Sequence, residues 1–170
     1  TSRPQSVVRV EIKDVKSGIQ YYLDHHEQIL TVFHKREMDR ILNAYSGIQD
    51  KSVSDEIEES FGFDMIVPKG FYVATNDSSN FMWIRKITRH IDEAIMIYRY
   101  PYTSESDLSK EAIIAKRNEI TQKRIPGPID SSYMKVSSVF PAFSEAVNFN
   151  DKYATLVRSW YDVQNFPYGG

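Results

Sequence analysis

In the segment SVVRVEI at 6–12, Val8, Val10 and Ile12 stand at every second position and so share one side of an extended chain. Apolar residues at every second position are typical of a strand with one covered face. The sequence therefore predicts a strand over 6–12.

Residues 15–46 follow a longer period. Apolar side chains recur at spacings of three and four, from Ile19 through Leu30 to Tyr45, as on one face of a helix. Gly47 is a suitable residue to end this helix. A shorter helix is predicted over 54–60, because Ser54 can cap it and the acidic residues that follow suit its positive N-terminal end.

Strand patterns begin after Gly62. Four segments are rich in β-branched and aromatic residues, and polar turn sequences separate them. This regular spacing favours an antiparallel meander. The predicted strands are FDMIVP (63–68), FYVAT (71–75), FMWIRKI (81–87) and EAIMIYRYPY (93–102), with Pro101 marking an edge or an exit from the ladder.

The last part of the chain predicts a helix over 106–123, capped by Ser106 or Ser109, and then more strands. These strands are YMKVSS (133–138), EAVNFN (145–150) and KYATLVRSWYDV (152–163).

The stretch RIPGPIDSSYM at 124–134 joins this helix to the strands. Pro126 disfavours helical geometry at Ile125, and Gly127 gives the turn its freedom. Asp130 and the two serines after it can form hydrogen bonds with nearby backbone. The stretch is therefore interpreted as a connector that turns a helix into a strand near Tyr133.

The order of these elements predicts an α+β fold, a mainly antiparallel sheet with two or three helices packed on one face. The length of 170 residues suits one domain, so we expect residues 1–170 to form a single α+β domain.

Composition narrows the possible partners. The formal net charge is -2, which argues against nucleic acid because phosphate binding needs a basic face. The chain has no cysteine, so disulfides and thiolate metal sites are excluded, whereas either redox compartment remains open. No apolar run approaches the roughly 18 residues of a membrane span.

The histidines and serines give little support for catalysis. His25 and His34 are nine residues apart and His26 and His34 are eight apart, so neither pair closes a metal site on one helix face. Ser131 and Ser132 lie far in sequence from every histidine that could act as a base. We therefore assign no catalytic residue, no metal site and no cofactor.

Basic residues near the end of the third predicted helix form a candidate anion site. Lys123 and Arg124 are its candidates, with Arg158 to complete it. The alternative, which we favour, is that these cations complement the negative C-terminal end of the helix.

Aromatic residues form a candidate ligand platform. In the predicted strand MIYRYPY, Tyr98 and Tyr100 fall on one face by period two, and Trp83 lies in the preceding strand. Such rings can stack on a sugar or a peptide, but more often they cover the helix side of a sheet. The candidate ligand-binding residues are Trp83, Tyr98, Tyr100 and Arg158.

Several segments in order resemble an uncharacterised family of Bacteroidetes lipoproteins, domain of unknown function 4837. These segments are IVPKGF (66–71), NFMWIRK (80–86), IYRYPYTSE (97–105), AKRNEITQKRIPGPIDSSYM (115–134) and FNDKYATLVRSWYDV (149–163). Family members tend to carry glycine where this chain has Ser131, and a Met-Gly-Gly-Pro-like segment where it has 166–170. The resemblance supplies no activity and no catalytic residues.

The resemblance implies an exported protein, located in the periplasm or at the outer membrane, that is held by a lipid on an upstream cysteine. We expect the chain to be a fragment of that longer lipoprotein, associated with the membrane only through this anchor. The preferred hypothesis is a non-enzymatic envelope domain with a binding or assembly role towards an envelope protein or a glycan.

Two other hypotheses stay open. One is a hydrolase or carbohydrate-processing enzyme whose site assembles only in the fold, around Arg158, Asp130 and the tyrosines. The other is a structural partner that contributes an exposed sheet edge to another subunit.

Overall fold

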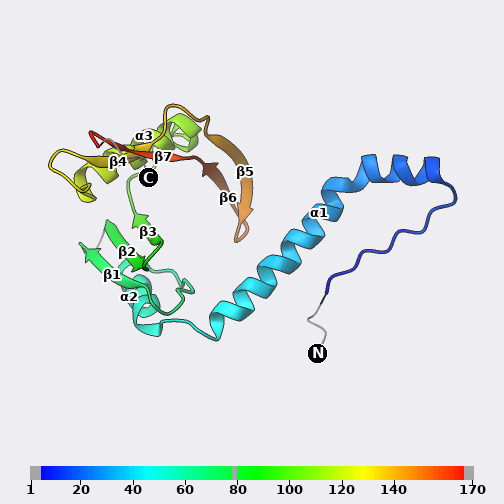
Figure 1. Cartoon of the computed structure of the whole chain (residues 1–170), viewed down its shortest axis with the longest axis horizontal. Coiled ribbons are helices and arrows are strands. Elements are labelled where there is room, and N and C mark those ends of the chain that lie inside the picture. Colours follow the sequence, from blue (N-terminus) through cyan, green and yellow to red (C-terminus); the bar gives the residue numbers. More distant parts are fainter. Residues whose placement is uncertain (1–4, 78–79, 167–170) are drawn as a thin grey trace. The chain divides into compact units, whose positions relative to one another are not determined.

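The computed structural model describes residues 5–77 and 80–166 (Figure 1). The described residues contain three α-helices, one short 3₁₀ helix and seven strands, and every named strand pairs antiparallel, which confirms the α+β class. The chain divides into two compact units, Thr1–Tyr100 and Pro101–Gly170, which we describe separately. That all 170 residues form one domain stays a prediction, and 167–170 lie outside the described residues.

Helix α1, Val15–Ser46, has the bounds that the sequence predicts. Its start is fixed by a reciprocal cap in which Ser17 N donates to Asp14 Oδ1 at 2.9 Å. Gly47 ends the helix, as predicted. None of its residues is buried, and no helix in the described part of the chain is long and apolar enough to cross a membrane.

The prediction of a strand over 6–12 is wrong. These residues form neither helix nor strand but run back along α1, where Val10 and Ile12 line a hollow with Ile19. The approach is close at Gly18, where an added Cβ would lie 2.6 Å from Ile12 Cδ1. The alternation of apolar residues over 6–12 therefore reflects an extended segment that has one side against a helix. It does not make a strand, because a strand also needs a partner strand.

Helix α2, Lys51–Phe61, starts earlier than predicted. The side chain of Asp50, rather than Ser54, caps it by accepting from Val53 N. Ser54 is buried within the helix, where its hydroxyl accepts from Gln49 Nε2 at 2.9 Å. The predicted N-terminus was therefore one turn too late.

Strands β1 (Tyr72–Asn76), β2 (Phe81–Ile87) and β3 (Asp92–Tyr98) form a sheet in the order β1-β2-β3, which confirms the meander. The chain leaves this ladder before Pro101, as predicted. The predicted strand over 63–68 is wrong, because this segment makes only an isolated bridge from Pro68 to Gln49. A neighbouring hydrogen bond from Asp50 N to Val67 O, 2.7 Å long, holds it beside the start of α2.

The core of the first unit lies between α2 and the sheet, which Figure 1 shows side by side. Ile57 and Phe61 of α2 pack in one cluster with Met82 and Ile84 of β2. These β2 residues are two apart and therefore share one face of the sheet. Burial of Val67 in the same cluster explains why its apolar segment resembles a strand in sequence.

In the second unit, a 3₁₀ turn (η1, Glu105–Leu108) precedes helix α3, Lys110–Arg124, which Ser109 caps. Strand β4, Tyr133–Val136, pairs with β7, Tyr161–Gln164. Thr121 Oγ1 of α3 donates to Met134 O of β4 at 2.6 Å, and Asn118 Oδ1 accepts from Val136 N at 2.8 Å. Polar contacts therefore join α3 to the two-stranded sheet.

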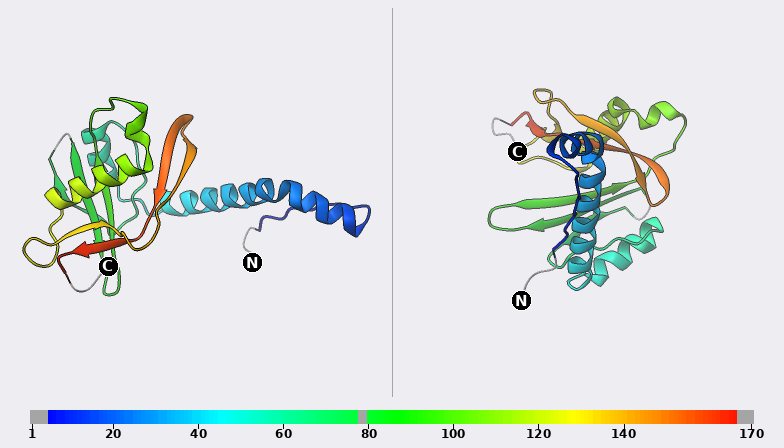
Figure 2. Two further views of the ribbon diagram at one scale, coloured as in Figure 1. Left: turned by 90° about the horizontal axis from the view of Figure 1, so that it is seen from above. Right: turned by 90° about the vertical axis from the view of Figure 1, so that its right-hand side faces the viewer.

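Strands β5 (Phe143–Phe149) and β6 (Lys152–Arg158) form a separate hairpin, seen as an isolated pair of strands in Figure 2. The single strand predicted over 152–163 is thus two strands, β6 and β7. The loop residues Asn150 and Asp151 have φ values of 50° and 59°. Two successive left-handed residues are typical of the tight turn that matches the twist of a hairpin.

The connector at 124–134 ends α3 at Ile125 and starts β4 at Tyr133, as predicted. Gly127 is needed for space, since an added Cβ would lie 2.2 Å from Ser132 Oγ. Ser131 has φ 64°, in the left-handed region that favours glycine.

Replacing Ile84 by alanine tests the core. Ile84 is 0% exposed, and its loss should lower the free energy of unfolding by about 2–5 kcal/mol in urea denaturation. Ile87 on the same strand is 56% exposed, and Ile87→Ala should change stability by no more than about 0.5 kcal/mol. Equal effects of the two variants would contradict this core.

Gly127→Ala should destabilise the protein by about 1–3 kcal/mol, because the new methyl group would overlap Ser132. Gly47→Ala is the matched control, since its nearest atom would be Ala44 O at 3.6 Å and its φ is -74°. Thermal unfolding of both variants compares them directly, and a neutral Gly127→Ala would show that the turn does not need glycine.

Candidate functional site

The strand register places the predicted aromatic residues together. Trp83 pairs with Met96 and Phe81 pairs with Tyr98, so Trp83 and Tyr98 share the face of the sheet opposite to Ile84. Tyr100 lies beyond β3, and its ring stacks on that of Tyr98 with centroids 6.1 Å apart. The structure therefore brings together three of the four candidate ligand-binding residues.

The polar edge of the Trp83 ring is not accessible to a ligand. Its indole Nε1 is buried and finds no hydrogen-bond partner among the residues that the structure describes. The guanidinium of Arg85 lies 4.6 Å from the ring centroid, and its own partner is Asp92. Side-chain hydrogen bonding to Asp92 raises the pKa of Arg85. The guanidinium of Arg85 therefore already lies over the Trp83 ring. Ligand binding by Trp83, Tyr98 and Tyr100 stays a prediction.

The candidate anion site lies at the end of α3. Lys123 Nζ is 2.8 Å from Glu119 Oε1, and Lys116 Nζ is 2.7 Å from the other oxygen of the same carboxylate. Hydrogen bonds from Lys116 and Lys123 lower the pKa of Glu119 to about 2. Lys123 and Arg124 occupy the last turn of α3, where cations complement the helix dipole, and an anion-binding role stays a prediction.

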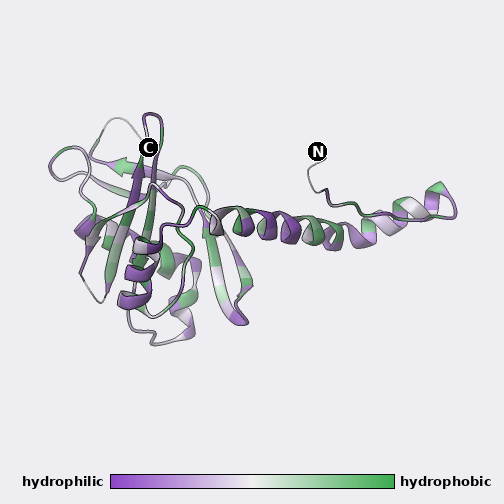
Figure 3. Cartoon of the chain, turned by 90° about the horizontal axis from the view of Figure 1, so that it is seen from below, coloured by the Kyte–Doolittle hydropathy of each residue, from purple (hydrophilic) through white to green (hydrophobic). Residues whose placement is uncertain are grey.

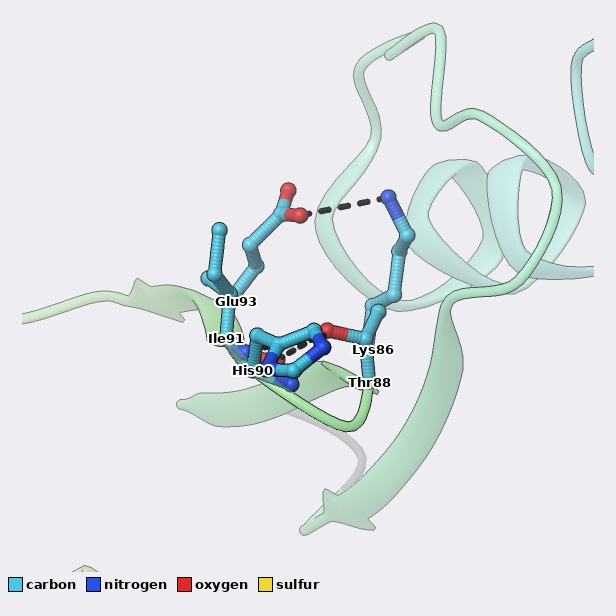
Figure 4. A network of polar contacts seen from close by, with 5 residues as sticks. All are labelled: Lys86, Thr88, His90, Ile91 and Glu93. Carbon is cyan, nitrogen blue, oxygen red and sulfur yellow. Dashed lines mark hydrogen bonds and ion pairs between the residues drawn. The ribbon is translucent and has the colours of Figure 1, made fainter.

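The histidines of the β2–β3 turn and of the first half of α1 make local contacts. His25 Nδ1 is 2.9 Å from Tyr21 O and His26 Nδ1 is 3.0 Å from Leu23 O, both on α1. Figure 4 shows His90 in the β2–β3 turn, where its backbone N–H donates to Thr88 Oγ1 beside the ion pair of Lys86 and Glu93. Within residues 5–77 and 80–166, no three histidine or acidic side chains are arranged so that they could hold a metal ion together.

The serines of the connector are structural. Ser132 is buried, and its hydroxyl donates to Ile129 O at 2.6 Å while accepting from Ile129 N at 3.1 Å. Asp130 is exposed in the same turn. The Ser132 hydroxyl therefore stabilises the turn and is not presented to a substrate.

An acidic hollow follows the outside of α2. Asp55, Glu56 and Glu59 line it on a single helix, and Asn76 Nδ2 donates to Glu56 Oε1 at 2.9 Å. Its other lining residues are Ser52 and Ser60. Neither a basic side chain nor a histidine lines this hollow in the described part of the chain, so it lacks the paired groups of a proton-transfer site.

Arg158 lies on a surface that the sequence did not reveal. It pairs across the hairpin with Phe143, and its Nη1 is 2.8 Å from Glu145 Oε1. A hollow of about 350 Å³ lies here between Phe143, Glu145, Leu156 and Arg158. We call this side of the hairpin the hairpin face; by register it consists of Phe143, Glu145, Val147, Phe149, Lys152, Ala154, Leu156 and Arg158.

Apolar and polar residues are mixed along the hairpin, as its colouring in Figure 3 shows, and most residues of the hairpin face are exposed. Phe143 and Phe149 are both exposed, and so is Leu156 between them on the partner strand. In the sequence, polar residues lie between Phe143 and Phe149, and the turn residues Asn-Asp follow them. This pattern could have indicated a hairpin with one apolar face. The sequence alone does not show whether such a face is covered.

Comparison with known proteins gives one family. The family described as "Domain of unknown function (DUF4837)" matches residues 50–170. Searches of curated proteins and of solved structures gave no match.

The Glu119 carboxylate provides a test of the helix-end charges. Its pKa is about 2 in the folded chain, below the ordinary 4.5, so its contribution to stability is complete above pH 4.5 and is lost as the pH falls towards 2. NMR titration of its side-chain carbon should give a midpoint near 2. The double change Lys116→Gln and Lys123→Gln should return the midpoint towards 4.5, whereas Lys51→Gln should not. An unchanged midpoint in the double variant would contradict this assignment.

Proposed function

The chain belongs to the DUF4837 family, a family described only as a domain of unknown function, and from this premise we propose that it is a non-enzymatic binding domain of a Bacteroidetes cell-envelope lipoprotein. In this proposal the hairpin face binds an extended segment of another envelope protein. The single observation that carries the proposal is the exposure of Phe143, Leu156 and Phe149 on one face of a two-stranded sheet.

Exposed apolar groups that gather on one face favour a binding role. Scattered single hydrophobic residues are normal on surfaces, whereas a contiguous patch with a charged rim is typical of interaction sites. Here the Glu145–Arg158 ion pair borders Phe143, and Lys152 lies across from Phe149. Three exposed apolar side chains therefore share this face with three charged ones.

The sheet topology favours a protein over a glycan as the ligand. β5 and β6 pair only with each other among the described strands, so each has an outer edge with backbone groups available. A partner strand can add to such an edge and place every second side chain on the hairpin face. Apart from Glu145, Lys152 and Arg158 the face carries only apolar side chains, whereas a sugar needs several hydrogen-bonding groups beside the aromatic rings.

The cell-envelope part of the proposal is supported by the resemblance of the quoted segments to exported lipoproteins. The longer protein would be held by a lipid on an upstream cysteine, which places the hairpin face at a membrane surface. The enzymatic alternative around Arg158, Asp130 and the tyrosines has weaker support, because Arg158 is paired with Glu145 and Asp130 is exposed in the connector turn.

A photo-crosslinking amino acid in place of Phe143 tests the proposal in the full-length protein in native membranes. The probe should capture one protein partner in the membrane fraction. Phe149→Ser should reduce capture at least about tenfold, because exposed aromatic groups of this kind dominate binding energy.

Tyr153→Ser is the matched control, since Phe149 and Tyr153 are both 67% exposed but lie on opposite faces of the hairpin. Capture that Tyr153→Ser lowers equally would contradict the assignment to one face. Capture of glycan only would overturn the proposal that the partner is a protein. Recovery of the protein in the soluble fraction would overturn the proposed lipid anchor.

A further inference from the structure

The segment that precedes α1 fits this helix by its geometry. We call residues 6–12 the N-terminal latch, because they run back along α1 (Figure 2). An extended chain advances about 3.3 Å per residue and a helix about 1.5 Å. Side chains at every second position of the latch therefore meet the helix about once in four residues. The spacing of Val8, Val10 and Ile12 thus matches a single strip along α1.

The helix residues that line hollows with the latch include such a strip. At about 100° per residue, five of them lie within about 60° of one another around the helix. These are Gly18, Tyr22, Ile29, Phe33 and Arg36. Gly18 and Ile29 are half-buried, whereas Leu23 and Leu30, which lie off the strip, are exposed.

The contact is closest at Gly18. An added Cβ at this position would lie 2.6 Å from Ile12 Cδ1 and 3.3 Å from Ile12 Cγ2. Glycine is a poor helix former, so its place in the first turns of α1 is best explained by the space that Ile12 needs. The reciprocal cap of Asp14 and Ser17 holds the chain reversal between the two.

The latch is held weakly. Among the described residues no backbone hydrogen bond joins 6–12 to α1, so apolar side chains provide the attachment. These side chains stay partly exposed, with values of 37% for Val8, 40% for Val10 and 53% for Ile12. Segments with few buried contacts and few hydrogen bonds open at a small cost in free energy.

Helix α1 depends on contacts of this kind. None of its residues is buried, and it packs extensively on no other helix or strand of the first unit. Most of the stability of a helix in a protein comes from packing of its apolar face. In the first half of α1, residues 15–30, the latch provides that packing.

We infer that docking of the N-terminal latch and helix formation over 15–30 are one coupled equilibrium, so that the latch acts as a conformational switch on α1. The docked latch covers the strip and holds these residues helical. Release of the latch exposes the strip and lets this half of α1 unwind more often. In the proposed lipoprotein, a pull from the membrane anchor would reach the latch before α1. Only this consequence rests on the proposed function, since the coupling is a property of the chain itself.

Hydrogen–deuterium exchange of backbone amides in the complete 170-residue chain tests the coupling, because exchange reports local opening. Ile12→Ser should raise the exchange rates over 19–30 at least about threefold, because it removes the closest latch contact. Val7→Ser is the control, since Val7 is 81% exposed and stands on the other side of the extended segment. Slow exchange in β2 checks that each variant remains folded.

Replacing Gly18 by leucine tests the sign of the effect. Leucine is a better helix former than glycine, so helix propensity alone would slow exchange over 19–30. Because the new side chain would take the place of Ile12, the latch requires that Gly18→Leu speeds exchange instead. In the Ile12→Ser background, where this contact is already lost, adding Gly18→Leu should slow exchange. A role of Gly18 unrelated to Ile12 would not produce this reversal.

Introduced thiols can trap the docked state. A Cβ at position 18 would lie 3.6 Å from Ile12 Cβ, within the range of about 3.5–4.5 Å that disulfides need. The chain has no cysteine, so Ile12→Cys combined with Gly18→Cys allows only this bond. Against a glutathione buffer, the bond should form at least about tenfold more favourably in native buffer than in concentrated urea. The oxidised chain should then exchange more slowly over 19–30 than the reduced chain.

Three results would overturn the inference. Equal exchange in Ile12→Ser and Val7→Ser would show that the latch does not hold α1. Slower exchange in Gly18→Leu alone would show that Ile12 does not pack on Gly18. Equal disulfide formation with and without urea would show that the docked state is not populated. Phe149→Ser should leave exchange over 19–30 unchanged, so these tests are separate from that of the hairpin face.

Discussion

The packing of α2 against one face of β2 is the interaction on which the first unit depends. Ile57 and Phe61 close over Met82 and Ile84, and this contact brings Val67 into the same cluster. It fixes which face of the sheet lies against α2, and through the β2–β3 register it turns Trp83 and Tyr98 to the opposite face. The capping of α2 by Asp50 belongs to the same arrangement, because Asp50 also donates its backbone N–H to Val67. Local capping and long-range packing thus specify one geometry.

Outside such contacts, much apolar side-chain area remains on the surface. On α1 no residue is buried, and on the β5–β6 hairpin Phe143, Phe149 and Leu156 are exposed on one face. The proposed binding role suits the hairpin, because its open edges can accept an extended backbone.

The sequence predicted those features that depend on local chemistry. The bounds of α1 follow from the helical period and Gly47, and the meander follows from regular turns. The position of Trp83 beside Tyr98 depends on the register between two strands, which no local pattern gives. Prediction from the sequence failed where a pattern has two physical causes. Alternation at 6–12 arises from contact with α1, and apolar character at 63–68 arises from burial of Val67. The hairpin face was missed because exposure depends on what covers a strand, which no local pattern records.

The turn at Asn150 and Asp151 bears on how the proposed binding to the hairpin face would proceed. Both residues hold left-handed backbone angles, and Asp151 N donates to Asn148 Oδ1 at 2.9 Å. The register of β5 and β6 is therefore set by residues next to one another in sequence, and not by a ligand. A surface that exists before the partner arrives loses little conformational entropy when the partner docks. Association should then require ordering only of the incoming strand, so differences in affinity between partners would arise from the partner's own flexibility.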